Sequence, residues 1–593
     1  MKRISALILC VMMVLSVITS CTTLEEDDKG AVIDVYLTNE IYDFDPARGF
    51  NDASTAKFLS LVFEGLTRLD ENGDWKAALM DDYVISQDDD EAFKIQITLN
   101  RTKWSDSRDV QANDIVYAWK RILDPEFKCE AANLLFDLKN AYKIKLGDAS
   151  VDDLGVAAIE TYVLEVEFEK KTDLDDFFRK AASPALVPVR EDIVSTNPNW
   201  AKKASSLITN GPFDVKEFTK GETLRLERSA YYYRDMKEDG ALDEYVIPYR
   251  IITHYDRGGL ANQLEEFLTG KIFYLGEIPL AKRAEFAEYA NASDYPATHT
   301  YLFNENNPVL SNADVRRALS LAVDRNKIAE LVVYADPATG LVPPITNDAD
   351  SGTKFRDAGG DLISKEADMA QAKRLVNSAG VSGTELTISI RNDEVDEAVA
   401  NYVKGVWEEL GFKVSVKKLR YSLDPDDSTI LIDNYYNDYI NGNFDIIAVD
   451  MTMLSSDASS ALIPFAKNYS GYGVNMEPEA DPDENGDEIY KYDQYTHVTG
   501  YDNENYNTLF DKYYETTDIS QRTSILHEAE KMLIDDAVVM PLYFEQDAFM
   551  FSDVLDHIGS SYYGRVFNNM EMDDYMSYKE DQGSIIDNPV KDD

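Results

Sequence analysis

Cysteine is scarce in this chain. Three occur among 593 residues, Cys10, Cys21 and Cys129, and the first two fall in an N-terminal segment that we expect to be an export signal and its cleavage site. Cys129 is then the one cysteine left in the mature chain, which excludes an internal disulfide and a metal site built from thiolates. An exported protein of this length without disulfides depends on its hydrophobic core.

Histidines and known catalytic motifs are also scarce. No G-x-S-x-G nucleophile turn and no phosphate-binding glycine loop occurs, and the segment 527–531 lacks the second histidine of a zinc-binding helix. We therefore expect no enzyme and no cofactor. The five histidines are scattered along the chain: His254, His299, His497, His527 and His557.

Basic residues are few for a chain of this size. Lys and Arg number 58 against 109 Asp and Glu, a formal net charge of −51 and a pI near 4.4. Such a surface repels phosphate backbones and anionic lipid headgroups, so we expect no nucleic-acid partner. Hydrophobic residues at 44% and aromatic residues at 11% are typical of a folded globular protein rather than a disordered one.

Long apolar runs are absent beyond the N-terminus, where Lys2 and Arg3 precede an apolar stretch over residues 4–18. The stretch is short for a membrane span and has the layout of an export signal. Small residues before Cys21 resemble a bacterial lipobox, which implies cleavage before Cys21 and a diacylglycerol on its sulfur. An ordinary signal peptide with a chance cysteine is the alternative. We predict a lipoprotein signal peptide over 1–20 and a polar tether over 21–30.

The stretch 58–125 organises the rest of the chain. Alternation of apolar and polar residues over 93–99 predicts a strand with one buried and one solvent-exposed face. Asn113 stands where a helix N-cap is expected, Asp114 falls in the first helical turn, and apolar residues follow at helical spacing until Asp124 and Pro125.

Two later blocks can be interpreted in the same way. Asn312 is expected to cap a helix with an apolar stripe over 315–323. Further on, a strand over 386–390, a helix over 395–410, the helix stop Gly411 and a strand from 412 form one unit. Two strands joined by a helix are parallel with a right-handed crossover, so this part is α/β. The apolar segment 537–544 predicts a strand broken by Pro541.

The order of these blocks resembles the extracytoplasmic solute-binding proteins of peptide-type ABC importers, the oligopeptide- and dipeptide-binding proteins of family 5. The matching segments are FEGL, WSDS, DIVYAWKRILDP, NGPF, VRRALSLAVDR and the GYDN ending, and the resemblance covers residues 32–575. The chain departs from the family pattern at Ser107, where a glycine is usual, and after Leu226, where an asparagine is absent.

The resemblance implies an α/β, two-lobed periplasmic-binding-protein-like fold of class II, peptide-binding type, with an extra subdomain in the first lobe. We expect a discontinuous lobe one over 31–65, 205–298 and 541–580, the extra subdomain over 66–204, and lobe two over 299–540. Receptors of this type close two lobes on the ligand like a hinge.

The family's cleft residues can be carried over to this sequence. The segment after the first strand corresponds to Glu40, Ile41 and Tyr42, although Glu40 is equally well explained as a solvated acid beside a turn. A second segment follows the strand at 444–449 and holds the peptide backbone by strand addition. The candidates there are Asp450, Met451, Thr452, Met453, Leu454 and Asp457; methionines on a buried strand are also typical of plain core. Tyr439, just upstream of the strand, is a further candidate that could line the pocket.

One of these positions departs from the family in a way that matters for the ligand. The family often has D-Y-x-D-P here, and its first aspartate pairs with the α-ammonium of the peptide, whereas this chain has Leu454. A buried ammonium needs a carboxylate, because removing a partner costs about 3–5 kcal/mol. Either Asp450 or Asp457 takes over the pairing, or the ligand is not a peptide with a free amine.

A stretch at 475–497 looks inserted relative to the family. Asp481, Asp483 and Asn485, followed by Gly486, have the spacing that opens a calcium loop. Tyr492 stands where a bidentate glutamate is wanted, so we favour a solvated acidic loop over a metal site.

The resemblance predicts a monomeric, lipid-anchored receptor at the periplasm or cell surface. It would bind an oligopeptide without chemistry and deliver it to an ABC permease and its ATPase. The alternatives are the same role for a non-peptide solute, such as an oligosaccharide or an amine-blocked peptide, and a surface lipoprotein that acts as an adhesin or chaperone. A hydrolase is a distant third.

Overall fold

The computed structural model describes residues 29–41, 43–50, 53–233, 245–478, 490–578 and 591–592. The predicted signal peptide, Cys21 with most of the tether, and Tyr42 lie outside these ranges, as do Asp481, Asp483 and Asn485. The predictions made for those residues stay predictions.

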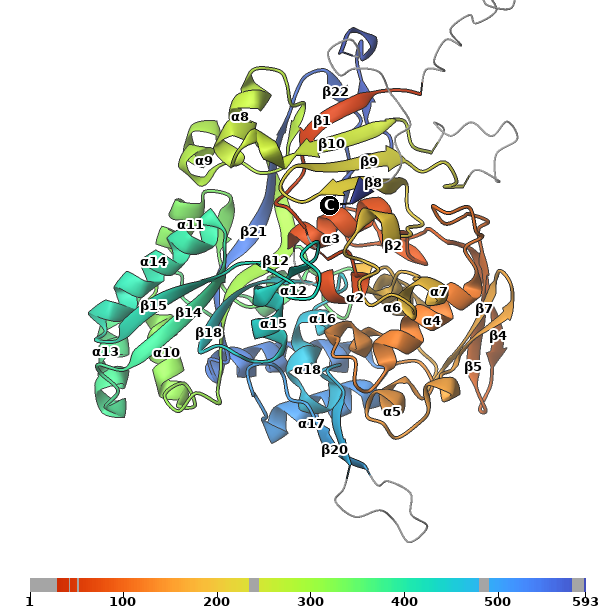
Figure 1. The fold of residues 1–593 in the computed structure, drawn as a ribbon. Helices are drawn as coiled ribbons and strands as arrows, with labels where there is room; N and C mark the ends of the chain where they lie inside the picture. Colours follow the sequence, from red (N-terminus) through yellow and green to blue (C-terminus); the bar gives the residue numbers. More distant parts are fainter. Residues whose placement is uncertain are drawn as a thin grey trace, which may run out of the picture.

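One twelve-stranded sheet runs through the molecule and joins two lobes (Figure 1). In Figure 1, β8, β9, β10 and β1 stack at the top, and β14, β15 and β18 lie at the lower left. The strand order is β15 (Lys413–Leu419), β14 (Glu385–Arg391), β18 (Ile446–Thr452), β12 (Asn291–Phe303), β21 (Val539–Phe551), β11 (Tyr274–Leu275), β1 (Val32–Tyr36), β10 (Arg250–His254), β9 (Thr223–Arg228), β8 (Phe213–Thr219) and β26 (Lys591–Asp592), with β13 (Ala335–Pro337) paired to β21.

The long strands β12 and β21 connect the lobes. Each has 13 residues, and they pair antiparallel from Asn291 opposite Phe549 to Leu302 opposite Val539. The expected break at Pro541 does not occur; instead the register shifts between His299 and Thr300, and β21 continues to Phe551. A bulge accommodates a proline because the locally disrupted ladder does not need its missing N–H. Both strands run through both lobes, so strand pairing gives no boundary between the lobes. The predicted lobe ranges therefore stay predictions.

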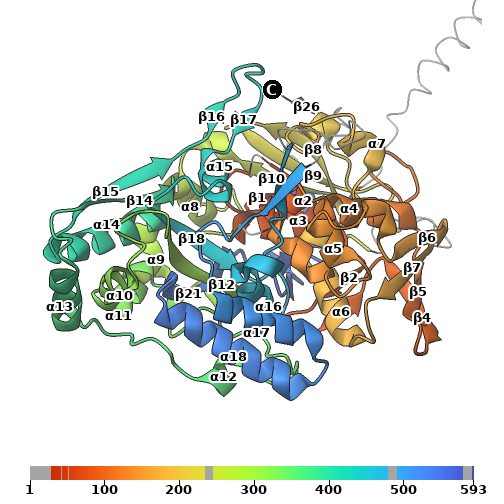
Figure 2. The same cartoon turned by 90° about the horizontal axis from the view of Figure 1, so that it is seen from below.

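The parallel unit predicted in lobe two is confirmed. β14 pairs with β15 in parallel register, and α14 (Glu394–Glu409) connects them. Asp393 caps this helix, and Gly411 follows its end at φ +101°, a left-handed conformation that favours glycine. Helices α10 (Ala313–Leu321), α11 (Arg325–Val332) and α13 (Met369–Ala379) surround the same part of the sheet (Figure 2), and Asn312 caps α10 as expected.

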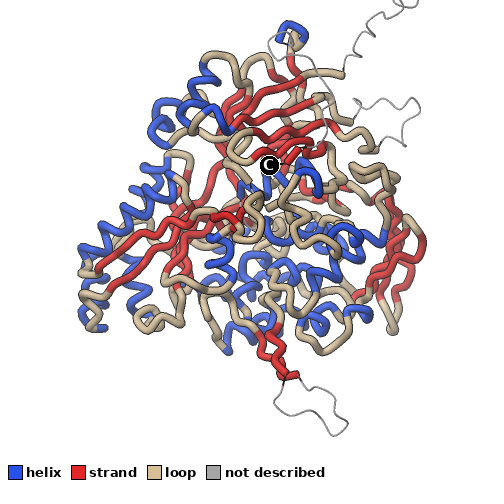
Figure 3. The backbone as a smooth tube through the Cα atoms, in the orientation of Figure 1, coloured by secondary structure: helices blue, strands red, loops and turns tan. Residues whose placement is uncertain are grey.

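The segment after the first helices forms a separate four-stranded sheet, on the right in Figure 3. Its order is β4 (Met80–Asp88), β5 (Phe93–Leu99), β7 (Val163–Phe168) and β6 (Val156–Glu160), and β5 alternates as predicted. Helix α4 (Ala112–Leu123) packs beside it, but its N-cap is Gln111 rather than Asn113. The Asp114 carboxylate accepts the Gln111 N–H over 2.9 Å and the Trp104 indole over 3.0 Å, which fixes the helix start two residues earlier.

A buried charge cluster ties this sheet's helix α6 (Leu174–Ala181) to α18 (Ile519–Asp535) of lobe two. Lys180 Nζ lies 2.7 Å from Asp137 Oδ2 and 2.9 Å from Asp176 Oδ2, and Arg522 of α18 lies 3.8 Å from Asp176. Burial by itself lowers the pKa of Lys180, yet the two carboxylates raise it well above the ordinary value. The ammonium therefore stays charged inside the protein. Among the described residues, no helix has the length and apolar composition needed to cross a bilayer.

Ser107, which stands where the family usually has a glycine, has a left-handed backbone conformation. Ser107, which is exposed, adopts φ +76° in a turn whose Ser107 N–H donates to the Trp104 carbonyl over 2.8 Å. A side chain in this left-handed region costs about 1 kcal/mol or more, because Cβ approaches the following carbonyl.

We expect Ser107→Gly to raise the free energy of unfolding by about 0.5–1 kcal/mol, the strain relieved minus the added entropy of the unfolded chain. Urea or thermal unfolding measures it. Ser107→Ala is the matched control, since it keeps Cβ and should bring no gain. A Gly variant no more stable than the Ala variant would show that the turn is unstrained.

Candidate cleft between the lobes

A cavity of about 340 Å³ lies between the two lobes. Lobe one contributes the segment after β1, the end of α2 (Pro46–Gly49) and the start of α3 (Ala53–Val62). Lobe two contributes the ends of β14 and β15 and the helix α15 (Asn434–Ile440). The charged and tyrosine side chains that line this first cavity are Glu40, Asp43, Arg48, Arg391, Asp393, Arg420, Tyr421, Asp433, Tyr435, Tyr436 and Tyr439.

A second cavity of about 170 Å³ adjoins the first, against the strand β21 that joins the lobes. The two cavities share Asn39, Ser54, Arg391 and Asp393 among their lining residues. We call the smaller one the hinge cavity. Its charged lining is Lys57, Glu277, Arg283, Arg391, Asp393, Asp396, Asp450 and Glu545.

Sheet geometry explains why charged groups gather here. Arg391 ends β14, Arg420 follows β15, and Asp450 lies near the end of β18. β14 is parallel to both of the other strands, so their carboxyl ends point the same way. Ligands of open α/β sheets bind at the carboxyl ends of the strands, where loops leave the sheet.

Four of the predicted ligand-binding residues line these cavities. Glu40, Ile41 and Tyr439 line the first cavity, and Asp450 lines the hinge cavity. Glu40 is held in place by the Gly221 N–H, which donates to its Oε1 over 2.5 Å. The fold thus brings a segment of lobe one and a helix of lobe two, some four hundred residues apart, to one cavity. Their role in binding stays a prediction.

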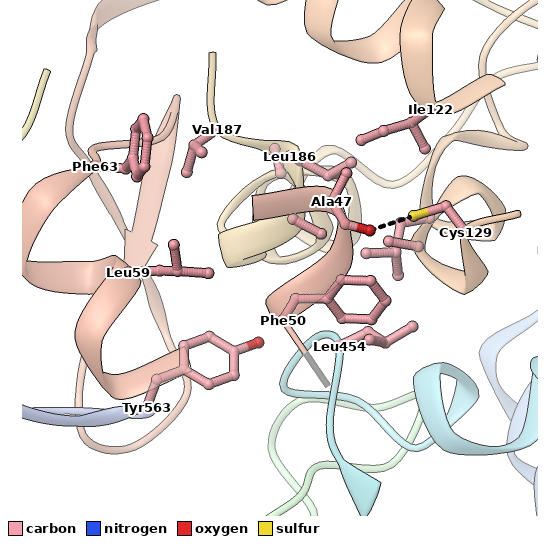
Figure 4. Packing of buried hydrophobic residues seen from close by; sticks show 14 of the residues in the cluster. Ala47, Phe50, Leu59, Phe63, Ile122, Cys129, Leu186, Val187, Leu454 and Tyr563 are labelled. Carbon is pink, nitrogen blue, oxygen red and sulfur yellow. Dashed lines mark hydrogen bonds between the residues drawn. The ribbon is translucent and has the colours of Figure 1, made fainter. Parts of the chain in front are cut away.

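The other predicted residues of the second segment do not line either cavity. Met453 and Leu454 are buried, and Figure 4 shows Leu454 pointing toward Phe50 in an apolar cluster. Asp457 is also buried, where it accepts from the Ser459 N–H over 2.9 Å and from the Ser455 hydroxyl over 3.2 Å. Its carboxylate therefore holds the start of α16 (Ser459–Leu462). Met451 and Thr452 are likewise absent from the lining of both cavities.

Asp450 is already engaged by two cations. His299 Nδ1 lies 2.5 Å from Asp450 Oδ1, and Arg391 Nη1 donates to Oδ2 over 2.8 Å. Burial by itself would raise the pKa of Asp450, but the His299 hydrogen bond and the two positive charges hold it below its usual range. Burial lowers the pKa of His299, and Asp450 outweighs this and raises it. Each partner therefore favours the charged form of the other.

Contacts across the cleft hold its two sides together. Tyr439 donates to Glu130 Oε1 over 2.6 Å, and Tyr472 donates to the same oxygen. On the other side, Lys203 Nζ lies 3.2 Å from Asp427 Oδ2. These contacts join residues far apart in the chain and link the segments on either side of the first cavity.

Most of the charged residues that line the two cavities were not predicted from the sequence. Arg391, Arg420 and Asp393 could have been found, because each closely follows the end of a predicted parallel strand. For Glu277 and Glu545 no sequence pattern points to the cleft. Their place depends on how β11 and β21 pair in space.

One group in the described part of the chain has the composition of a metal site. His299, Asp450 and Glu545 each offer an atom within 4.8 Å of the other two. The Arg391 guanidinium on Asp450 disfavours a metal ion there, because a second cation would compete for the same carboxylate.

We expect Asp450→Asn to lower the pKa of His299, because burial then outweighs the remaining charges. In the wild type the raised pKa stabilises the fold at low pH, and this contribution is lost as pH rises through the folded-state pKa; the variant should lack that pH dependence. NMR titration of ¹³C-labelled histidines measures both. Asp438→Asn, at an ion pair with Lys417 on the same lobe, should leave His299 unchanged. An unaltered His299 titration in Asp450→Asn would contradict the pairing.

Known proteins share this sequence pattern and architecture. The model of the bacterial extracellular solute-binding proteins, family 5, matches residues 75–473. The dipeptide-binding protein DppE of Bacillus subtilis is 26% identical over 517 residues, which are 86% of each chain, and the oligopeptide-binding protein OppA of the same species is 24% identical over 540 residues, 89% of this chain and 90% of that one.

The solved structure of Listeria monocytogenes OppA bound to peptide has the same fold, with a TM-score of 0.74 at 20% identity over 92% of this chain and 99% of that one. This likeness confirms the two-lobed α/β fold that the sequence predicts. The family match extends over the four-stranded sheet, the strands β8 to β10, β12, β14, β15 and β18, and the part of the first cavity's lining from Arg391 to Val449. By sequence and by fold, the chain belongs to the bacterial extracellular solute-binding proteins of family 5.

Proposed function

We propose that this chain is the substrate-binding receptor of an ABC importer, which captures oligopeptides between its lobes and delivers them to a membrane permease. The observation that carries the proposal is a cavity lined from both lobes by acids, arginines and tyrosines together. A peptide offers charges of both signs and a polar backbone, which this lining can meet. Relatives with this sequence pattern are named for dipeptides and oligopeptides.

The edge of β18 supports a peptide rather than another solute. On the β14 side, β18 pairs only at Ile446 and Ile447, whereas on the β12 side it pairs as far as Thr452. Within the described residues, the stretch from Ala448 to Thr452 therefore has one edge without a strand partner. An extended peptide can add to such an edge by backbone hydrogen bonds. Val449 and Asp450 of this stretch line the two cavities.

Export and anchoring complete the proposal. The N-terminal segment would direct the chain across the membrane, and a diacylglycerol on Cys21 would keep the receptor beside its permease. A single tether of about ten residues leaves the lobes free to close. The receptor would act as a monomer and release its ligand chemically unchanged.

Native mass spectrometry of residues 22–593, which include every described element, tests the ligand class. We expect heterogeneous added masses that fragment as short peptides, because backbone recognition tolerates many side chains. A single added mass that is not a peptide would indicate another solute, such as an oligosaccharide. A bare protein that neither peptides nor sugars stabilise against heat would contradict a role in transport and favour an adhesin or chaperone.

The anchor is tested by Cys21→Ser in the full chain. We expect the protein to move from the membrane fraction to the aqueous fraction and to lose palmitate labelling, because the acylated sulfur is gone. Cys129→Ser is the control, since Cys129 is buried and burial raises its pKa to about 12, which makes the thiol unreactive. Unchanged fractionation of Cys21→Ser would contradict the lipid anchor.

A further inference from the structure

The hinge cavity lies where five elements of the fold meet. Lys57 comes from α3, Glu277 from the loop after β11, Asp396 from the first turn of α14, Asp450 from β18, and Glu545 from β21. Because β21 joins the lobes, a ligand group in this cavity would touch both lobes at their connection.

Acids outnumber bases in this cavity. Five carboxyl groups line it, against the three cationic side chains Lys57, Arg283 and Arg391. Lys57 Nζ lies 2.5 Å from Asp547 Oδ1, outside the lining, and Arg283 donates to the carbonyls of Ile278 and Val332. The five carboxyl groups are those of Glu277, Asp393, Asp396, Asp450 and Glu545.

Three of these acids, Glu277, Asp393 and Glu545, have no ion pair among the described residues, and Asp393 instead accepts backbone N–H groups at the start of α14. Glu277 accepts only long contacts from Thr38 and Asn39, at 3.4 and 3.5 Å. Glu545 Oε1 is buried and has no hydrogen-bond partner, although the Glu545 carboxyl also hydrogen-bonds to Asp450. Burying an unpaired carboxylate is costly, and Lys57, the cation near both acids, is itself paired with Asp547.

Tyr543 provides an independent indication. Its side chain is 4% exposed and lines the hinge cavity, and its ring stacks on His299 with centroids 4.7 Å apart. Within the described part of the chain its hydroxyl makes no hydrogen bond, whereas buried tyrosine hydroxyls usually find a partner. A hydroxyl can accept a hydrogen bond from a ligand that has only donors to offer.

We propose that the hinge cavity is the subsite for a primary ammonium group of the ligand, held by Glu277 and Glu545 with the Tyr543 hydroxyl beside them. The inference rests on the proposed function and deepens it, because it names the group that the receptor selects. An ammonium is compact and has three donors and no acceptor, which matches two carboxylates and a hydroxyl. The ammonium can be the α-amino group of a peptide or the side chain of a lysine.

The subsite replaces the carboxylate that the segment 450–457 does not supply. Leu454 packs against Phe50 in the apolar cluster (Figure 4), Asp457 holds the start of α16, and Asp450 is neutralised by His299 and Arg391. None of the three is left to pair with an ammonium in the first cavity.

The protonation of the cavity agrees with a missing cation. Burial, and then the charge of Asp393, raises the pKa of Glu277 to about 7 despite the nearby Lys57 and Arg283. Burial and the charge of Asp450 raise the pKa of Glu545 well above its ordinary value. A bound ammonium would add positive charge beside both groups and favour their ionised forms.

Binding of three tetrapeptide libraries by residues 22–593 tests the subsite. One library has a free amino terminus and no lysine, one is acetylated and contains a single lysine, and one is acetylated without lysine. Equilibrium dialysis with mass spectrometry measures the retained amounts. We expect the wild type to retain one of the first two at least tenfold better than the third, and which one is retained identifies the source of the ammonium.

The double variant Glu277→Gln/Glu545→Gln should lose this preference, so that the ratio of retained amounts falls to near 1. Tyr543→Phe should reduce the preference about threefold. Glu285→Gln, an exposed acid on α9 (Leu280–Phe286), is the matched control and should keep the wild-type ratio. Thermal unfolding of each variant at pH 6 shows that it is folded.

Three results would overturn the subsite. Equal retention of all three libraries by the wild type would contradict the subsite, and so would an unchanged preference in the double variant. Either result would leave peptide binding, and so the proposed function, standing. Loss of the preference on adding EDTA would assign the site to a metal ion on His299, Asp450 and Glu545. Retention of no library by the wild type would contradict both the proposed function and the subsite.

Discussion

The pairing of β12 with β21 is the constraint on which the rest of the structure depends. These two strands belong to both lobes, so the lobes share one sheet and the cleft opens beside the joining strands. The bulges in this pairing change the local direction of the strands, which is how a sheet bends without losing most of its hydrogen bonds. The register of β12 against β18 also sets His299 opposite Asp450, so the electrostatics of the hinge cavity follow from the same ladder.

Most buried carboxylates in the described part of this protein are paired with a cationic side chain. The chain carries a large excess of acid, and inside it Asp176 and Asp137 pair with Lys180, and Asp547 pairs with Lys57 and Arg565. A buried charge without a partner is unfavourable, so such pairs are required by the fold itself. The hinge cavity departs from this arrangement, and a departure of this kind is typical of a binding site rather than of structural core.

Leu454 and Phe50 lie in one apolar cluster that joins segments far apart in the chain. Leu454 comes from the segment after β18 in lobe two, and Phe50 follows α2 in lobe one, so the contact contributes apolar burial between the lobes (Figure 4). Burying a leucine side chain is worth about 1.5–3 kcal/mol. That burial stabilises the approach of the two segments.

Local pattern determined much of this protein. The alternation at β5, the cap at Asn312, the parallel unit around α14 and the order of the family's segments were all predictable, because each depends on residues close together in the sequence. Neighbouring interactions alone were insufficient at Asn113, where Trp104 and Asp114 moved the helix start, and at Pro541, where a bulge kept β21 intact. The presence of Glu277 and Glu545 in one cavity, and the pairing of Asp450 with His299 and Arg391, were decided only by the tertiary structure. Those contacts join residues more than fifty positions apart, and no local pattern encodes which strands meet or which charges are neutralised when they do.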